Sequence, residues 1–249
     1  MGDGASGRGM ECRQSAAVTV DAGTATGRVS QLYSRSGQIT IASHVRPRLA
    51  VRTYPLRERR QAGEFLIRLL DVFGSLFILA LTLPVMAVSS LFIRITMGKP
   101  VFFRQERVGL GGDVFTLYKF RTMINDAEKH VGPVWAARDD SRVTPVGRIL
   151  RKMRIDELPQ LYNILRGDMS LVGPRPERPF FVNRHTALQG ARLAVKPGLT
   201  GLAQIRGFYD LKPTHKVKYD CLYIQKRSFL LNVYILLRTI PALFTKMGW

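Results

Sequence analysis

The most constraining feature of the chain is a long apolar run, "VFGSLFILALTLPVMAVSSLFI", over Val72–Ile93. Its 22 residues contain no charged side chain. A helix needs about 20 apolar residues to cross the hydrocarbon core of a bilayer, so this run is long enough to do so. A buried core helix of a soluble protein is the alternative, and it is the rarer outcome at this length. The run therefore predicts a membrane helix.

Two further features of the run argue against a simple crossing. Pro84 stands near its middle, where a proline removes a helix hydrogen bond and kinks the chain. Basic residues flank both ends, namely Arg57, Arg59, Arg60 and Arg68 before it and Arg94, Lys99, Arg104 and Arg107 after it. Positive charge favours the cytoplasmic side. A re-entrant hairpin over residues 64–98, broken at Pro84, satisfies both flanks, while a single crossing with an internal proline also fits the residues.

The chain as a whole is strongly basic. It has 38 Lys and Arg against 18 Asp and Glu, a formal net charge of +20. Such an excess indicates a polyanionic partner: nucleic acid, anionic membrane lipid or a phosphorylated substrate. The aromatic residues lie mostly in apolar runs rather than among the basic ones, so we expect no nucleic-acid partner. Cys12 and Cys221 provide no disulfide framework, which favours a reducing compartment.

Composition predicts three segments. Residues 1–60 are expected to form a poorly ordered basic tail, since their first 45 residues are rich in Gly, Ser, Thr and Ala without a period. Residues 61–100 are expected to form the membrane helix hairpin. Residues 101–249 are expected to form a small cytosolic α/β domain, mainly helical, with amphipathic helices at the membrane interface. One of these follows Ser228, a candidate N-cap, and its apolar face fits either the core or the interface.

The soluble domain begins with strands and continues with helices. "VFFRQERVG" and "DVFTLYKFRTM" are short, partly alternating segments separated by "LGG", and they predict two strands. Thr144 and Pro145 are typical of a helix N-cap and first helical position. The stretch "RIDELPQ" then opens a second helix that Gly167 ends. Pro159 is tolerated only in a first turn, so Asp156 is expected at or next to the N-cap, with Glu157 in the first turn.

The acidic pair is surrounded by basic residues, whose side chains we expect to bind phosphate. Arginines bind phosphates bidentately, and a helix N-terminus favours an anion. A carboxylate beside phosphates needs an intervening cation, and Mg²⁺ uses one or two carboxylates together with phosphate oxygens. A carboxylate can also act as a nucleophile toward phosphorus. Paired acids, clustered arginines and a membrane helix together favour phosphoryl transfer that involves a lipid.

The segment "TPVGRILRKMRIDELPQLYNILRGDMSLVGPRPE", with "KFRTM" and "KPGLTGLAQIRG", closely resembles the bacterial sugar transferases, the monotopic phosphoglycosyl transferases. The resemblance covers roughly residues 63–246. It implies transfer of a sugar-1-phosphate from a UDP-sugar to polyprenol (undecaprenyl) phosphate with release of UMP, through a covalent aspartyl phospho-sugar and with Mg²⁺. It also implies a location at the cytoplasmic face of the bacterial inner membrane, in the first membrane step of exopolysaccharide or other glycoconjugate assembly.

The same resemblance assigns roles to individual residues. Asp156 is implied to be the nucleophile and Glu157 its partner, both as Mg²⁺ ligands with Glu157 the main one. Phosphate binding is implied for Arg151 and Arg175, and for Lys119 and Arg121 of the "KFR" motif. Pro84 is implied to be the helix breaker. The chain departs from many members at Leu83, where some have Ser, and at Asn232, where many have Asp. The sequence leaves the sugar and the oligomeric state open.

Overall fold

The computed structural model describes residues 61–129, 132, 134, 140–206 and 213–244, and these form a mixed α/β fold that is mainly helical. The tail predicted over residues 1–60 lies outside the described residues. In chain order the elements are α1 (Gln61–Thr96), β1 (Phe102–Val108), β2 (Val114–Phe120), α2 (Pro145–Lys152), α3 (Gln160–Arg166), β3 (Ser170–Val172), α4 (Pro179–Arg184), β4 (Gly198–Thr200), α5 (Leu202–Ile205), α6 (Pro213–Lys226) and α7 (Phe229–Phe244), with short 3-10 turns between some of them. The predicted fold class is confirmed at this level.

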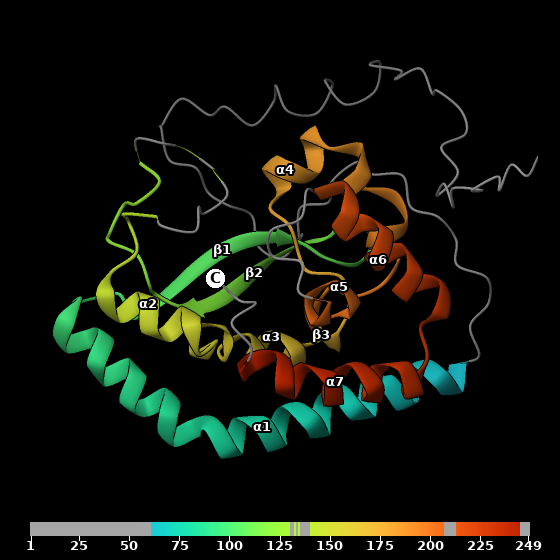
Figure 1. The fold of residues 1–249 in the computed structure, drawn as a ribbon, viewed down its shortest axis with the longest axis horizontal. Coiled ribbons are helices and arrows are strands. Elements are labelled where there is room, and N and C mark those ends of the chain that lie inside the picture. The colour runs from blue at the N-terminus through green and yellow to red at the C-terminus, as the bar shows by residue number, and fades with distance from the viewer. Residues whose placement is uncertain (1–60, 130–131, 133, 135–139, 207–212, 245–249) are drawn as a thin grey trace, which may run out of the picture. The chain divides into compact units, whose positions relative to one another are not determined.

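The apolar run lies within one long helix, α1, which Figure 1 shows bent into a shallow V. The break expected at Pro84 is thus a bend within one continuous helix, and the re-entrant course of this helix stays a prediction. Pro84 lies inside the helix, and a proline there removes a single backbone hydrogen bond, which a helix accommodates by bending. By length and composition, Ala62–Thr96 is able to cross a membrane.

The first half of α1 is attached to the soluble domain by two polar side chains. Arg68 donates to the carbonyls of Ile164 and Leu165, at 2.7 and 2.9 Å, and so satisfies the C-terminal end of α3. Asp71 accepts a hydrogen bond from the hydroxyl of Ser170 and one from the next backbone N–H, both at 2.8 Å. These contacts fix α1 to α3 and β3, the elements on either side of which the acidic pair and Arg175 lie.

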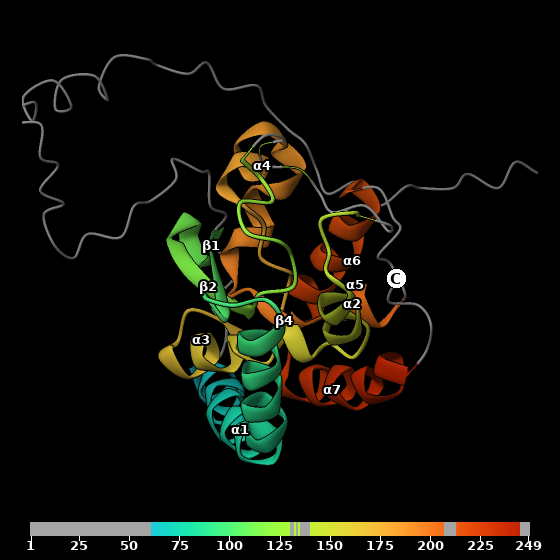
Figure 2. The same ribbon diagram turned by 90° about the vertical axis from the view of Figure 1, so that its left-hand side faces the viewer.

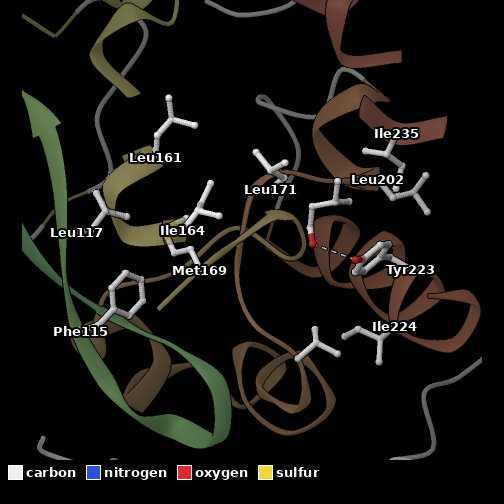
Figure 3. Close-up of a cluster of buried hydrophobic side chains, with 12 residues drawn as sticks. Phe115, Leu117, Leu161, Ile164, Met169, Leu171, Leu202, Tyr223, Ile224 and Ile235 are labelled. Atoms are coloured by element: carbon white, nitrogen blue, oxygen red, sulfur yellow. Dashed lines mark hydrogen bonds between the residues drawn. The ribbon is translucent and has the colours of Figure 1, made fainter. Parts of the chain in front are cut away.

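The strands form two small sheets. β1 and β2 pair antiparallel, with Phe102 opposite Phe120 and Val108 opposite Val114, which confirms the two strands expected from the sequence. β3 and β4 pair in parallel. The main core lies between these sheets and α3, α5, α6 and α7 (Figure 3). In it, the Tyr223 hydroxyl lies 3.0 Å from the carbonyl oxygen of Val172 and 2.9 Å from Oδ1 of Asn232. Asn232, one of the departures from the family pattern, thus serves core packing here.

Helix α7 lies beside α1 in both views (Figures 1 and 2). The Ser228 hydroxyl accepts a hydrogen bond from the N–H of Leu231 at 3.3 Å, which confirms the predicted N-cap. Ile235 on one side of the helix is fully buried, whereas Leu230 and Leu237 on the other side are 78% and 62% exposed. The sequence left open whether the apolar residues of this helix pack in the core or lie at a surface. In the structure the helix has both a core face and an exposed apolar face.

Candidate active site

The two adjacent acids lie in a 3-10 turn, Ile155–Glu157, between α2 and α3. Arg154 precedes this turn in the left-handed region at φ 58°, and this reversal separates the acids from α2. Pro159 is the N-cap of α3, so Asp156 is one turn earlier in the chain than the N-cap position expected for it. The displacement arises because the chain closes a separate 3-10 turn before the regular helix begins after Pro159. Both carboxylates are buried, at 7% and 9% exposure.

Glu157 is held by two cations from distant parts of the chain. Nζ of Lys119, on β2, lies 3.2 Å from Oε1 of Glu157. Nη2 of Arg175, from the loop between β3 and α4, lies 2.6 Å from the same oxygen. Burial alone would raise the pKa of Glu157, but the charges of Arg175 and Lys119 outweigh it and hold that pKa well below its usual range. The two cations therefore favour the charged form of Glu157 at this buried position.

Asp156 has a contrasting environment. Its burial raises the pKa of the carboxyl to about 6, and the neighbouring Glu157 charge acts in the same direction, against Lys119 and Arg151. A carboxylate that is less stabilised by ion pairing than its neighbour is the more basic and more nucleophilic of the two. The site thus contains two adjacent acids with different chemical character, which is the arrangement needed for two different roles.

Arg151 approaches the pair from α2, where a close contact fixes its position. Its Nε donates to the hydroxyl of Thr122 at 2.8 Å. Gly147, one turn earlier on α2, has no room for a side chain, since a Cβ would lie 1.9 Å from the carbonyl oxygen of Thr122. The Thr144 hydroxyl accepts from the N–H of Gly147 at 3.0 Å, which confirms the predicted N-cap. The close approach of α2 to Thr122 therefore directs Arg151 toward Asp156.

Arg121 is not brought to the acidic pair. Its guanidinium donates to the carbonyls of Gly98 and Lys99, both at 2.9 Å, and also contacts the carbonyl of Met97 and the side chain of Asn125. These carbonyls follow the C-terminal end of α1, where backbone acceptors have no partner within the helix. Arg121 thus binds the backbone that follows α1, and the phosphate role expected for it from the "KFR" motif stays a prediction.

Pro84 lines an apolar groove of about 390 Å³ between the second half of α1 and α2. At one wall the groove includes Ile155, which directly precedes Asp156. The lining residues are Pro84, Val85, Val88, Ser89 and Phe92 of α1, with Val146, Ile149, Leu150 and Ile155 from α2 and the turn after it. The groove therefore extends from α1 to Ile155, the residue next to the acidic pair.

The acidic pair is the part of the site that could hold a metal ion. Within the part of the chain that the structure describes, no group of three or more His, Cys, Asp or Glu side chains is close enough to hold a metal. This excludes there a cage made wholly by such side chains. Two adjacent carboxylates offer hard oxygen donors, which suit an ion that takes only one or two carboxylates and completes its shell with other oxygen ligands.

The sequence analysis missed several residues that build the site. Thr122 and Gly147 have no sequence signal beyond the "KFRTM" and "TPVG" segments that contain them. Arg192 and Asp220 form a buried ion pair at 2.7 Å, and Arg192 also donates to the backbone of Arg175. Both stand singly, 28 residues apart in the chain, and no spacing rule connects them. Only the tertiary fold brings them to the site.

Comparison with known proteins supports an enzymatic site. Residues 62–246 match the family model described as Bacterial sugar transferase. The sugar transferase EpsL of Bacillus subtilis (strain 168) is 42% identical over 183 residues, which cover 73% of this chain and 88% of that protein. The UDP-glucose:undecaprenyl-phosphate glucose-1-phosphate transferase of Caulobacter vibrioides is 43% identical over 194 residues, 75% of this chain and 72% of its own length.

A third relative is matched over a smaller part of its length. The UDP-N-acetylgalactosamine-undecaprenyl-phosphate N-acetylgalactosaminephosphotransferase of Aeromonas hydrophila is 40% identical over 190 residues, which cover 74% of this chain and 45% of that protein. The Caulobacter vibrioides and Aeromonas hydrophila transferases are named for different sugars, glucose and N-acetylgalactosamine. Similarity to them therefore indicates a reaction class and leaves the sugar undetermined.

Proposed function

The chain belongs to the bacterial sugar transferase family, and we propose that it transfers a sugar-1-phosphate from a UDP-sugar to polyprenol phosphate, releasing UMP, as an early membrane step of exopolysaccharide synthesis. The names of relatives support the donor and acceptor classes, and one similar protein is named for exopolysaccharide production in Rhizobium meliloti. The single observation that carries the proposal is the buried Asp156–Glu157 pair with Lys119 and Arg175 on Glu157.

We assign the nucleophile to Asp156. One of its carboxylate oxygens attacks the phosphorus that carries the sugar, the bond from that phosphorus to the oxygen bridging to UMP breaks, and UMP leaves with the bond electrons. A phosphate oxygen of the acceptor then attacks the same phosphorus and releases the Asp156 carboxylate. The higher pKa of Asp156 supports this choice over Glu157, whose charge is engaged by two cations.

Lys119, Arg151 and Arg175 are assigned to the diphosphate of the donor. A guanidinium can bind two phosphate oxygens at once, and buried cations oppose the charge that develops as UMP leaves. Glu157 and Asp156 would hold Mg²⁺, which supplies charge neutralisation at the diphosphate when bound. Glu157 has the further role of fixing Lys119 and Arg175 where the donor phosphates must lie.

We also propose that α1 enters and leaves the bilayer on its cytoplasmic face, so that the site lies at that face of the inner membrane. The bend in α1, the basic flanks and the exposed apolar side of α7 support this arrangement. The polyprenyl chain of the acceptor would then lie in the apolar groove beside Pro84, with its phosphate directed past Ile155 to Asp156. Anionic lipids would attract the basic flanks.

The reaction is tested by incubating the purified protein with a panel of UDP-sugars, Mg²⁺ and polyprenol phosphate, and measuring UMP. We expect one or a few sugars to give UMP and a polyprenol-linked product. UMP release from none of them, or a product that is a free sugar phosphate, would contradict the assignment. The panel also identifies the sugar, which small differences in the pocket decide.

The topology is tested separately with single cysteines at Gly63 and Lys99, in a protein whose two natural cysteines are replaced. A Cβ at Gly63 meets no atom within 4 Å, and Lys99 is exposed, so both changes fit the fold. In intact cells, both positions should resist an impermeant thiol reagent and both should react after permeabilisation. Labelling of only one of them in intact cells would show that α1 crosses the bilayer.

A further inference from the structure

The loop that carries Arg175 is held by its backbone in an unusual way. It follows β3 as "GPRPE", and the two prolines at positions 174 and 176 have no N–H to donate. Its four consecutive carbonyls each accept a hydrogen bond: Pro174 from the N–H of Gly198 at 2.9 Å, Arg175 from Nη2 of Arg192 at 2.9 Å, Pro176 from Nη1 of Arg107 at 3.0 Å, and Glu177 from the N–H of Val108 at 2.9 Å.

The two middle carbonyls, those of Arg175 and Pro176, are bound by arginine side chains from separate elements. Arg107 lies on β1, and Arg192 lies in the 3-10 turn Gly190–Ala194. Both side chains are largely buried, at 18% and 5% exposure. The loop backbone is therefore held at and beside Arg175, whose Nη2 lies 2.6 Å from Oε1 of Glu157.

The charges of these two arginines are compensated locally. Nε of Arg192 lies 2.7 Å from Oδ2 of Asp220, on α6, and both members of the pair are buried. Arg107 lies 3.9 Å from the carboxylate of Glu177. Since each charge has an acid partner of its own, what the two arginines share is their hold on the backbone of the loop.

We propose that Arg107 and Arg192 are positioning residues that act through Arg175, holding its guanidinium where the donor diphosphate must bind. The inference rests on the proposed function of Arg175. Catalytic geometry tolerates little displacement, since a shift of about 1 Å can lower a rate roughly 100-fold. Lysine in place of either arginine keeps the charge but has one ammonium in place of a planar fork, so it cannot hold a carbonyl and an acid together in the same way.

The test is a pair of double-mutant cycles, Arg192→Lys and Arg107→Lys, each combined with Arg175→Lys. The first measurement is kcat/KM for the UDP-sugar in the donor half-reaction, followed as UMP release without lipid. The second is the dissociation constant of UDP, the probe that needs no turnover. The matched control is Arg227→Lys, a buried arginine that pairs with Glu64 away from the loop. Thermal unfolding of every variant shows whether it is folded.

Each single change at Arg107 or Arg192 should lower kcat/KM on the order of 10- to 100-fold and weaken UDP binding, as expected for a displaced charged hydrogen-bond donor. In the Arg175→Lys background the same change should lower kcat/KM less than about threefold, because the guanidinium that it positions is already absent. Arg227→Lys should have the same small effect in both backgrounds. Arg107→Lys is the variant to rely on if Arg192→Lys fails to fold, since Arg107 is the more exposed residue.

Equal losses in the presence and absence of Arg175 would overturn the positioning role and assign both arginines to general stability. A wild-type protein that binds UDP but releases no UMP from any UDP-sugar would contradict the proposed reaction, while the UDP-binding cycle would still decide the positioning role. A wild-type protein that does not bind UDP would overturn both.

Discussion

Two clusters of charge lie near the end of β2, and they differ in what their cations bind. In the first, Lys119 and Arg175 both contact Oε1 of Glu157, beside Asp156. In the second, Arg121 binds the carbonyls that follow α1. Lys119 and Arg121 are only two residues apart in the chain. In the first cluster the cations donate to a side-chain carboxylate, whereas in the second the cation donates mainly to backbone carbonyls.

The difference shows what makes a basic residue available for a substrate. Both terminal nitrogens of the Arg121 guanidinium donate to backbone carbonyls at a helix end, where the charge also compensates the helix dipole. Lys119 and Arg175 instead share one carboxylate oxygen, and a guanidinium has further donors that point away from such a contact. Changes in the first cluster should therefore alter chemistry at constant stability, and changes in the second should alter stability at constant chemistry.

The largest effect is expected for Glu157→Gln. Glutamine keeps the size but removes the charge that holds Lys119 and Arg175, and it is a weaker ligand for Mg²⁺. We expect kcat for UMP release to fall on the order of 100- to 1,000-fold, the usual cost of one preorganised electrostatic group. Steady-state assays across a Mg²⁺ titration should show a raised metal requirement, and EDTA should stop the wild-type reaction. A near-normal rate at ordinary Mg²⁺ would place Glu157 outside the chemistry.

Arg121→Met should act on the fold. It leaves several partly buried carbonyls without their donor, so the free energy of unfolding should fall by about 2–4 kcal/mol. The rate of the donor half-reaction per folded molecule should stay within about threefold of wild type. Denaturant unfolding in detergent and an assay of the folded fraction measure the two quantities. A normal stability together with a raised KM for the UDP-sugar would instead make Arg121 a phosphate ligand.

A smaller effect on chemistry is expected for Arg175→Lys. The charge is kept, but the planar fork that can contact Glu157 and a phosphate together is lost. The transition-state stabilisation measured by kcat/KM for the UDP-sugar should fall by about 1–3 kcal/mol, the range for a hydrogen bond to a charged group. The melting temperature should change little, because Arg175 is one-third exposed. An unchanged rate at both limiting and saturating donor would show that this guanidinium does not bind the diphosphate.

Local features of the fold were predictable from the sequence, because their causes are local. The N-caps at Thr144 and Ser228 and the end of α3 at Gly167 follow from side-chain hydrogen bonding and from the left-handed backbone that glycine permits. The two strands of the hairpin follow from their alternating pattern and the glycines between them. The mixed, mainly helical class followed from the same patterns.

The direction of individual side chains was not predictable. Alternation along a strand would place Lys119 and Arg121 on the same face. β2 ends at Phe120, however, and beyond it Arg121 turns to the end of α1. The sequence predicted a bend at Pro84, and α1 has Pro84 inside one continuous helix, but no sequence rule gives the size of such a bend. Arg192 donates to the carbonyl of Arg175, which lies 17 positions earlier in the chain, and no sequence pattern indicates such a contact.

The central claim is that Asp156 forms a covalent bond to the phospho-sugar while Glu157 organises the cations around it. It is tested most directly by incubating the enzyme with Mg²⁺ and the UDP-sugar it accepts, without lipid, and measuring the intact protein mass after quenching. The account predicts an adduct of one sugar phosphate on the wild type, absent from Asp156→Asn and formed more slowly by Glu157→Gln. No adduct on the wild type, with kinetic lines for donor and acceptor that intersect instead of running parallel, would contradict it.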